Sequence, residues 1–237
     1  MNVLVLGATG VVGDAVVREA LTDDRVHAVL AVGRRQIAHT HPKLETILLE
    51  DFTDFSPLGP RLADVGAVLC ALGVSWYQAG GEAQYRRITH DYVLSCARVS
   101  SIANPSMRFC FVSGHGASAA SSQPWARIKA ETEHDLEGIF GSRLTVFRPG
   151  YIHPIHGRAK PYWGDSVMRP FMPFRRWMRR WITDSQEVAR AVLHCALGGR
   201  VQSPAENHAI IAAAAAYAAT RLPTDRAASQ KSARTSK

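Results

Sequence analysis

The chain has 237 residues, 46% of them hydrophobic, and a formal net charge of +8. This length and apolar fraction suit one α/β domain with a large core. The charge is uneven, since residues 169–181 hold five arginines and no acid, and residues 221–237 hold five basic side chains and one acidic one. Because the remainder is close to neutral, we expect no nucleic-acid partner.

The cysteine pattern and the N-terminal stretch bear on the compartment. Cys70, Cys96, Cys110 and Cys195 are far apart and form no C-x-x-C pair, as expected of reduced, buried thiols. The chain enters a strand-like run at Asn2 without a charged leader. No apolar run reaches the ~18 residues needed to span a bilayer. These features predict a cytoplasmic protein.

The first 150 residues alternate between strand and helix patterns. Residues 2–21 read as an all-apolar strand, a glycine turn and a helix of period 3.6. Further strands are predicted at 27–35, 44–52, 65–73, 108–114 and 143–150, with helices around 88–98 and 124–140. This order predicts an α/β fold, a doubly wound, Rossmann-like parallel sheet built from right-handed βαβ units.

After Gly150 the pattern loosens. We expect a nucleotide-binding domain over residues 1–211 that includes a small C-terminal substrate lobe at about 150–183. Residues 184–197 read as an amphipathic helix with Asp184 or Ser185 as N-cap and Glu187 in its first turn. The alanine-rich and basic stretch 212–237 is expected to be a frayed or disordered tail.

The turn after the first strand carries Gly7, Gly10 and Gly13 in a G-x-x-G-x-x-G arrangement. Glycine permits unusual backbone angles there and lets a pyrophosphate approach the helix N-terminus. The alternative is close helix–strand packing without a ligand. The candidate cofactor-binding residues of this turn are Gly7, Thr9, Gly10, Val11, Val12 and Gly13.

The residues after the second strand bear on which dinucleotide binds. An acidic residue there would bond the ribose of NAD, but this chain has Arg34 and Arg35. Paired guanidinium groups suit a 2′-phosphate, so NADP is favoured over NAD, although one arginine alone could point into solvent. Further candidates follow the third and fourth strands: Asp51 and Phe52 beside the adenine, and Ala71, Leu72 and Gly73 along the cofactor.

The segments "GATGVVG", "ALG", "VSG" and "FRPG", with Lys129 on a helix between the last two, resemble the short-chain dehydrogenase/reductase superfamily in its atypical branch. The resemblance is to bacterial NAD-dependent epimerase/dehydratase-like proteins and to the oxidoreductase group related to the Tat-interacting protein. It implies that Ser113 is the catalytic serine, that Lys129 grips the nicotinamide ribose and that Pro149 lies along the nicotinamide. It also implies a homodimer through the helices around 88–98 and 124–140.

In the same alignment of motifs Trp125 takes the place of the proton-donating tyrosine. The indole N–H donates a hydrogen bond but releases no proton at any usable pH. His115, Tyr77 or Tyr85 could supply the proton instead, or a quinone or flavin-like acceptor could need none in the hydride step. The alternative for His115 is that it is a solvated loop histidine and supplies no proton.

Two further sequence patterns are candidate binding sites. Residues 174–181, "FRRWMRRW", read as an amphipathic helix that either packs on the domain, contacts a membrane surface or an anionic partner, or sends an arginine to a substrate phosphate. His153 and His156 lack a nearby cysteine or carboxylate, so no metal site is expected.

The sequence therefore predicts an NADP-binding oxidoreductase-like or epimerase-like protein that acts on a small carbonyl, quinone or sugar-nucleotide substrate. The alternative is a catalytically weak or inactive regulatory protein that senses NADP(H). The presence of Ser113 and Lys129 favours the first hypothesis, and Trp125 favours the second.

Overall fold

The computed structural model describes residues 1–157 and 177–221. Within them, a seven-stranded sheet has the order β3-β2-β1-β4-β5-β6-β9, and every neighbouring pair is parallel. Its strands are β1 (Asn2–Leu6), β2 (Ala28–Gly33), β3 (Leu44–Leu48), β4 (Val65–Cys70), β5 (Arg108–Val112), β6 (Leu144–Arg148) and β9 (Ala205–Glu206). The predicted doubly wound parallel sheet is confirmed.

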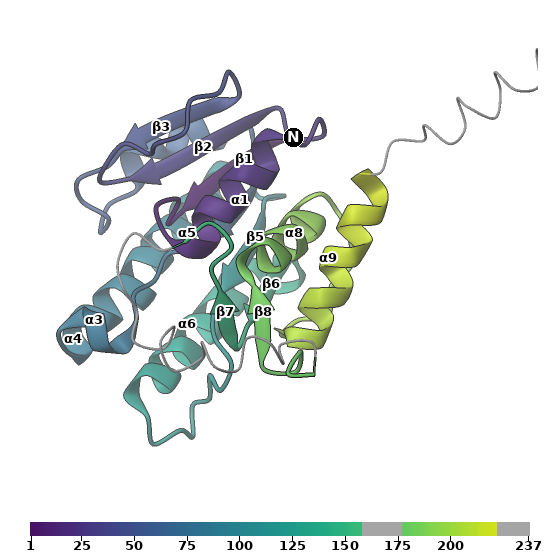
Figure 1. Cartoon of the computed structure of the whole chain (residues 1–237). Coiled ribbons are helices and arrows are strands. Elements are labelled where there is room, and N and C mark those ends of the chain that lie inside the picture. The colour runs from purple at the N-terminus through teal and green to yellow at the C-terminus, as the bar shows by residue number, and fades with distance from the viewer. Residues whose placement is uncertain (158–176, 222–237) are drawn as a thin grey trace, which may run out of the picture.

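Helices cover both faces of this sheet (Figure 1). They are α1 (Val11–Leu21), α2 (Gly59–Leu62), α3 (Trp76–Ala79), α4 (Glu82–Arg86), α5 (Tyr92–Ala103), α6 (Pro124–Phe140), α8 (Ser185–Ala196) and α9 (Asn207–Arg221). Short 3₁₀ segments are η1 (Ser56–Leu58) and η3 (Gly141–Arg143), and the π-helical segment η2 (Arg87–Asp91) joins α4 to α5. A separate pair of strands, β7 (Tyr151–His153) and β8 (Ile182–Asp184), is also parallel.

The core forms two layers because the side chains of each strand alternate between the two faces of the sheet. Val3 and Val5 of β1 pack into one layer with α1, α8 and α9. Leu4 and Leu6 pack into the other layer with α5 and α6. Both faces are therefore apolar, which explains the unbroken hydrophobic run of the first strand.

Helix α8 begins where the sequence predicts. The Asp184 side chain accepts a hydrogen bond from the Glu187 backbone N–H at 2.8 Å, and the Glu187 side chain accepts one from the Asp184 N–H at 3.1 Å. This reciprocal capping box satisfies two backbone donors at the helix start.

The expectation of a frayed tail from residue 212 is wrong for its first part. Helix α9 continues to Arg221, and its alanines Ala213 and Ala214 are buried. The reason is a distant partner, since the buried Tyr217 hydroxyl donates to Asp23 at 2.7 Å. Alanine packs well at a close helix–helix contact, and the sequence gives no local sign of that contact. Residues 222–237 lie outside the described residues.

The helix expected at 174–181 is not what the described part of that segment forms. Residues 177–181 make turns, in which the Trp181 N–H donates to the Met178 carbonyl at 2.8 Å. Residues 174–176, and most of the expected substrate lobe, lie outside the described ranges. All four cysteines are buried free thiols, as predicted. In the described residues no helix is both long and apolar enough to cross a membrane.

Candidate functional site

The glycine turn sits between the carboxyl end of β1 and the N-terminus of α1. The Gly10 N–H donates to the Gly7 carbonyl at 2.8 Å, and Gly7 has a φ of 81°. A Cβ at Gly7 would collide with the Ala71 carbonyl, and one at Gly13 would collide with the Gly7 carbonyl. Backbone packing within the protein therefore already requires glycine at these two positions. The turn also leaves the first backbone amides of α1 without a side-chain cap.

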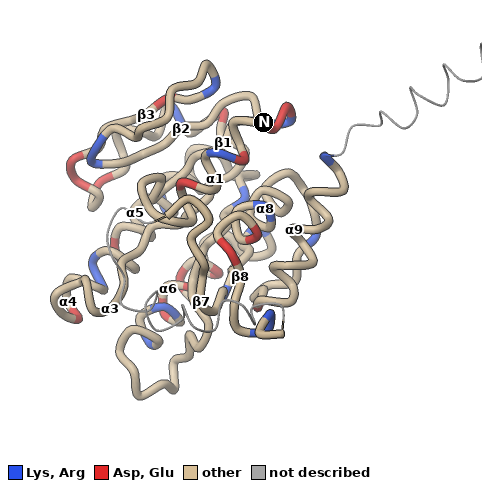
Figure 2. Tube along the Cα trace, viewed as in Figure 1, with Lys and Arg blue, Asp and Glu red and all other residues tan. Residues whose placement is uncertain are grey.

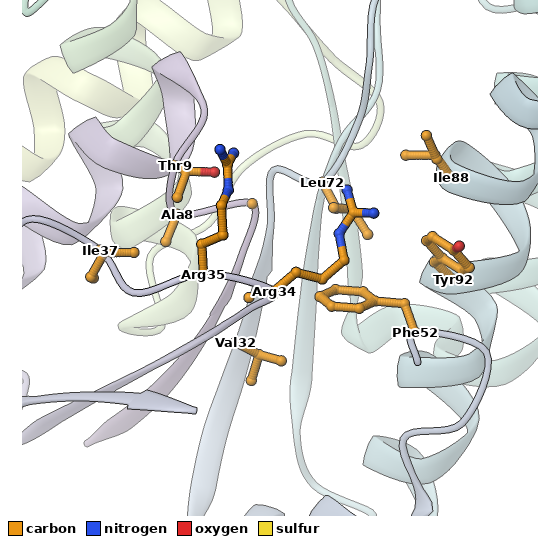
Figure 3. Close-up of a pocket in the computed structure, with 12 residues that line it drawn as sticks. Ala8, Thr9, Val32, Arg34, Arg35, Ile37, Phe52, Leu72, Ile88 and Tyr92 are labelled. Atoms are coloured by element: carbon orange, nitrogen blue, oxygen red, sulfur yellow. The ribbon is translucent and has the colours of Figure 1, made fainter. Parts of the chain in front are cut away.

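A crevice opens beside this turn at the carboxyl edge of the sheet (Figure 3). It is lined by Gly7, Ala8, Thr9, Val32, Gly33, Arg34, Arg35, Ile37, Phe52, Leu72, Ile88 and Tyr92. Of the predicted cofactor residues, the structure brings together here Gly7, Thr9, Arg34, Arg35, Phe52 and Leu72. The remaining ones do not line it: Gly10, Val11, Val12, Gly13, Asp51, Ala71, Gly73, Lys129 and Pro149.

Arg34 and Arg35 flank the crevice from the end of β2. In Figure 3 the Arg35 side chain extends beside Thr9, whereas Arg34 extends above Phe52 toward Leu72. Both are exposed, and among the described residues neither guanidinium group has a hydrogen bond or ion pair. Two guanidinium groups without protein partners can donate hydrogen bonds to an anion at this crevice.

The far wall of the crevice adds Ile88 and Tyr92, which the sequence analysis did not name, to the predicted Phe52. Phe52 and Tyr92 lie with ring centroids 5.6 Å apart, and Ile88 comes from the π-helical segment η2. Asp51 turns away, because its carboxylate accepts hydrogen bonds from the Thr53 N–H and hydroxyl at 2.8 and 2.7 Å. Phe52 therefore lines the wall on this side, and Asp51 organises the loop behind it.

Lys129, on α6, lies further along the same edge of the sheet. Its Cδ and Cε atoms pack beside Gly114, and its ammonium lies 5.7 Å from the centroid of the Phe111 ring. Burial lowers the pKa of Lys129 to about 8, although the negative charge of Glu133 acts in the opposite direction. Within the described residues this ammonium has no hydrogen bond or ion pair. It is available to a ligand.

Ser113 is buried directly after β5. The hydroxyl donates to the carboxylate of Glu133, one helical turn beyond Lys129. Arg148, at the end of β6, binds the same carboxylate, with Nε 3.1 Å from each oxygen. A hydroxyl has one proton, so this network leaves Ser113 able to accept a hydrogen bond from a ligand but not to donate one.

Trp125 packs in a small aromatic cluster above β4. It contacts a group formed by Ala79, Tyr85 and Ile128, against which Trp76 also packs. Tyr85 is 2% exposed and lies edge-on to Trp76 at 5.2 Å. Burial raises the pKa of Tyr85 to about 12. Tyr85 is therefore a packing residue, and Tyr77 is largely exposed on α3.

His115 lies in the loop that follows β5. Its Nδ1 is 2.9 Å from a carboxylate oxygen of Glu206, at the end of β9, and its ring stands edge-on to Trp181 at 5.1 Å. The side chain is 46% exposed. The sequence pattern predicted a role for His115 but gave no sign of its partner Glu206, because 91 residues separate the two.

Groups of potential metal ligands were compared across the described residues. His153 lies in β7 and His156 in the turn after it, and neither belongs to such a group. One group does occur, His90 with Glu131 and Asp135, whose ligand atoms lie within 4.8 Å of one another. There the carboxylate of Glu131 is bound by Arg86, so it is engaged in an ion pair on the helix surface.

The amino-acid sequence is similar to those of several known proteins. The mitochondrial protein FMP52 of Eremothecium gossypii is 31% identical over 168 residues, which is 70% of this chain and 73% of that protein. FMP52 of Chaetomium globosum is 28% identical over 81% of this chain and 85% of that protein. The protein HTATIP2 of Rattus norvegicus is 28% identical over 72% and 69%. No protein-family model matches the chain.

Solved structures share the fold at lower identity. MoeE5 in complex with UDP-glucuronic acid and NAD has a TM-score of 0.65 and 19% identity, over 86% of this chain and 74% of that one. A short-chain dehydrogenase/reductase family oxidoreductase from Burkholderia thailandensis has a TM-score of 0.58 and 19% identity, over 82% and 84%. WbmF of Bordetella bronchiseptica, in complex with NAD+, has a TM-score of 0.62 and 14% identity, over 82% and 69%.

One expectation is overturned by these relatives. The sequence features predicted a cytoplasmic protein, whereas the FMP52 relatives are named as mitochondrial. The prediction failed because the cysteine pattern and the lack of an apolar span do not distinguish between two reducing compartments. The chain belongs to the FMP52 family, and it shares its fold with an oxidoreductase of the short-chain dehydrogenase/reductase family.

Proposed function

We propose that the protein is an NADP-dependent reductase of a small carbonyl or quinone compound. The observation that carries the proposal is a set of three cations at the carboxyl edge of the sheet, Arg34, Arg35 and Lys129, which have no hydrogen bond or ion pair among the described residues. Cations that the fold leaves without a hydrogen bond or ion pair can bind an anionic ligand, and this supports the proposal.

A phosphorylated dinucleotide fits the residues present. The glycine turn keeps side chains away from the uncapped amides of α1, where a pyrophosphate would bind. The two arginines would hold a 2′-phosphate beside the turn, and Phe52 and Tyr92 would border the adenine. NAD lacks the phosphate that the arginines would bind, so NADP is the cofactor that we favour.

Lys129 would contact the nicotinamide ribose and raise the local positive potential. A bound nicotinamide would supply the hydride chemistry. Ser113 would accept a hydrogen bond from the ligand, because its own proton is donated to Glu133. Epimerisation of a sugar nucleotide is a further candidate reaction, since solved relatives of the same fold bind UDP-sugars with NAD.

A second candidate function is a regulatory protein that senses NADP(H). It is favoured by two observations at the reacting end: Trp125 stands at the tyrosine position of the motif, and the Ser113 proton is committed to Glu133. Both remove the usual proton donors while leaving the phosphate contacts intact.

Turnover separates the two functions. Oxidation of NADPH is followed with aldehydes, ketones and quinones, and epimerisation is followed with UDP-sugars. We expect reduction of at least one class, with kcat/KM for NADPH about tenfold or more above that for NADH. Arg35→Gln should reduce this preference by about tenfold, since one charge-assisted contact contributes about 1.5–3 kcal/mol.

The matched control is Arg98→Gln, an exposed arginine on the outer side of α5, which should leave the preference unchanged. Binding of NADPH without turnover of any compound would contradict the reductase and support the sensor. An unchanged preference in Arg35→Gln would contradict the assignment of the 2′-phosphate.

A further inference from the structure

Carbonyl reduction at this site needs a proton for the substrate oxygen, and the residues already described do not supply it. The Trp125 indole is not an acid, Ser113 donates its proton to Glu133, and Tyr85 is buried with its pKa raised to about 12. Lys129 is committed to the ribose in the function proposed above. The inference that follows rests on that proposed function.

The backbone on either side of His115 lies beside the residues at the lysine and tyrosine positions of α6. A Cβ at Gly114 would lie 3.5 Å from Cδ and Cε of Lys129, and a Cβ at Gly116 would lie 3.6 Å from Cη2 of Trp125. The loop therefore runs alongside Lys129 and Trp125, the two α6 residues that stand at the lysine and tyrosine positions of the motif. The His115 N–H donates to the Pro149 carbonyl at 2.9 Å, which ties the loop to the end of β6.

The His115 ring is held in one orientation from two sides. Glu206 accepts at Nδ1 over 2.9 Å, and Trp181 packs against the ring with an interplanar angle of 86°. Within the described residues Nε2 has no hydrogen-bond partner. A carboxylate at one ring nitrogen fixes the tautomer and leaves the other nitrogen to exchange a proton. The 46% exposure of the side chain gives this nitrogen access to solvent.

The geometry points to His115 as the proton donor of the reduction, with Glu206 as its positioning residue. A bound reduced nicotinamide would supply the hydride that forms the C–H bond at the carbonyl carbon, and the C=O π electrons would move to oxygen. That oxygen takes the proton from Nε2 of the imidazolium, which becomes a neutral imidazole with Nδ1–H still bonded to Glu206. Solvent then returns a proton to Nε2. In this assignment a histidine from the loop after β5 takes over the task of the missing phenol on α6.

The kinetic test replaces the donor and then restores one. His115→Gln should lower kcat about 10²–10⁴-fold, which is the usual contribution of general acid–base assistance, while the Kd for NADPH stays within twofold. The control His208→Gln changes an exposed histidine two residues beyond Glu206 and should leave kcat unchanged. Adding Trp125→Tyr to His115→Gln should recover at least tenfold of the lost rate, because a phenol then stands where the motif expects it.

A second readout needs neither cofactor nor turnover. In the cofactor-free protein, ¹⁵N NMR of the neutral His115 ring should show the Nδ1–H tautomer. In Glu206→Ala the same ring should shift toward the Nε2–H tautomer, and the fold of this exposed strand end should be retained by circular dichroism. A Nε2–H tautomer in the unmodified protein would overturn the role of Glu206.

The outcomes distinguish this inference from the function on which it rests. If the unmodified protein turns over no substrate of the panel, the reductase itself fails and the proton donor with it. If it turns over substrate and His115→Gln keeps kcat within twofold, His115 is overturned and the reductase stands.

Discussion

Where α1, α8 and α9 meet, acidic side chains are bound by basic and polar partners, and Figure 2 shows basic and acidic positions close together along α1 and α8. At the carboxyl edge of the sheet, by contrast, three cations have no hydrogen bond or ion pair among the described residues. Glu19, 6% exposed, accepts from Arg190 at 3.1 Å, from Arg221 at 2.8 Å and from the Gln186 amide at 2.7 Å. We call this cluster the paired cluster, with Asp23 and its partners Arg25 and Tyr217 included. Arg34, Arg35 and Lys129 are the unpaired set.

The difference teaches how to separate structural charge from functional charge. Arginines of the paired cluster join helices that are far apart in sequence, and their removal should lower stability. The unpaired set contributes nothing of that kind, and one member is held at a cost of desolvation. We interpret the unpaired set as charge placed for a ligand, because its three members gather at the carboxyl edge of the sheet.

The largest expected effect is the loss of the paired cluster's central carboxylate. Glu19→Gln keeps the shape of the side chain but removes the charge that Arg190 and Arg221 share. Breaking a largely buried ion pair is costly, so the free energy of unfolding should fall by about 3 kcal/mol. Urea denaturation at neutral pH measures it. A loss below 0.5 kcal/mol would show that the arginines are satisfied by water, in the manner of ordinary surface pairs.

The next effect concerns Asp23 and acid. Burial alone would raise the pKa of Asp23, but hydrogen bonds from Arg25 and Tyr217 outweigh it and lower the pKa from 3.8 to about 2. Because the folded-state pKa is the lower one, the stabilisation is complete above 3.8 and is lost as the pH falls through about 2. Asp23→Asn should therefore cost about 2 kcal/mol at neutral pH.

The matching measurement is a series of urea titrations between about pH 7 and pH 2. The stability gap between the unmodified protein and Asp23→Asn should stay constant down to about pH 4 and shrink below it. A gap that is the same at every pH would mean that the hydrogen-bond geometry, and not the charge of Asp23, supplies the stability.

Removal of the Lys129 charge should have the opposite effect on the free energy of unfolding. Burial lowers its pKa from 10.5 to about 8, so the charged form is penalised in the folded state, and the penalty is complete below about 8 and vanishes as the pH rises to 10.5. Lys129→Met should raise the free energy of unfolding by about 1 kcal/mol at neutral pH, after allowance for partial exposure. It should also abolish turnover. A loss of stability in Lys129→Met would contradict the distinction between the two sets.

The smallest effect on stability is expected at Arg34. The side chain is exposed and has no hydrogen bond or ion pair within the described residues, so Arg34→Gln should change the free energy of unfolding by less than about 0.5 kcal/mol. Thermal unfolding without ligand measures this. A larger change would mean that the arginine is part of the fold after all.

Local patterns allowed most of the fold to be predicted. The β1 run, the glycine turn and the Asp184 cap each depend on a few adjacent residues, and each formed as expected. The end of the chain did not, because α9 is held by Tyr217, whose partner Asp23 is 194 residues away. Within the helix expected over 174–181, the described residues 177–181 form turns, and the Trp181 carbonyl accepts a hydrogen bond from the Tyr151 N–H at the start of the β7–β8 pair.

The site was predicted less completely. Arg34, Arg35 and Phe52 follow strand ends, which converge at one edge of a parallel sheet, so their meeting could be anticipated. Tyr92 and Ile88 reach the crevice through a π-helical segment that the sequence pattern does not signal. The partners Glu133 for Ser113 and Glu206 for His115 lie 20 and 91 residues away, and spacing alone gives no means of pairing them.

The central claim is that the unpaired set holds a phosphorylated dinucleotide, and calorimetric titration of the unmodified protein with NADPH and with NADH tests it most directly. NADPH should bind at least tenfold more tightly than NADH, with the advantage falling at higher salt because the arginine contacts are electrostatic. Equal affinity for the two nucleotides, or no heat of binding with either at millimolar concentration, would contradict the account.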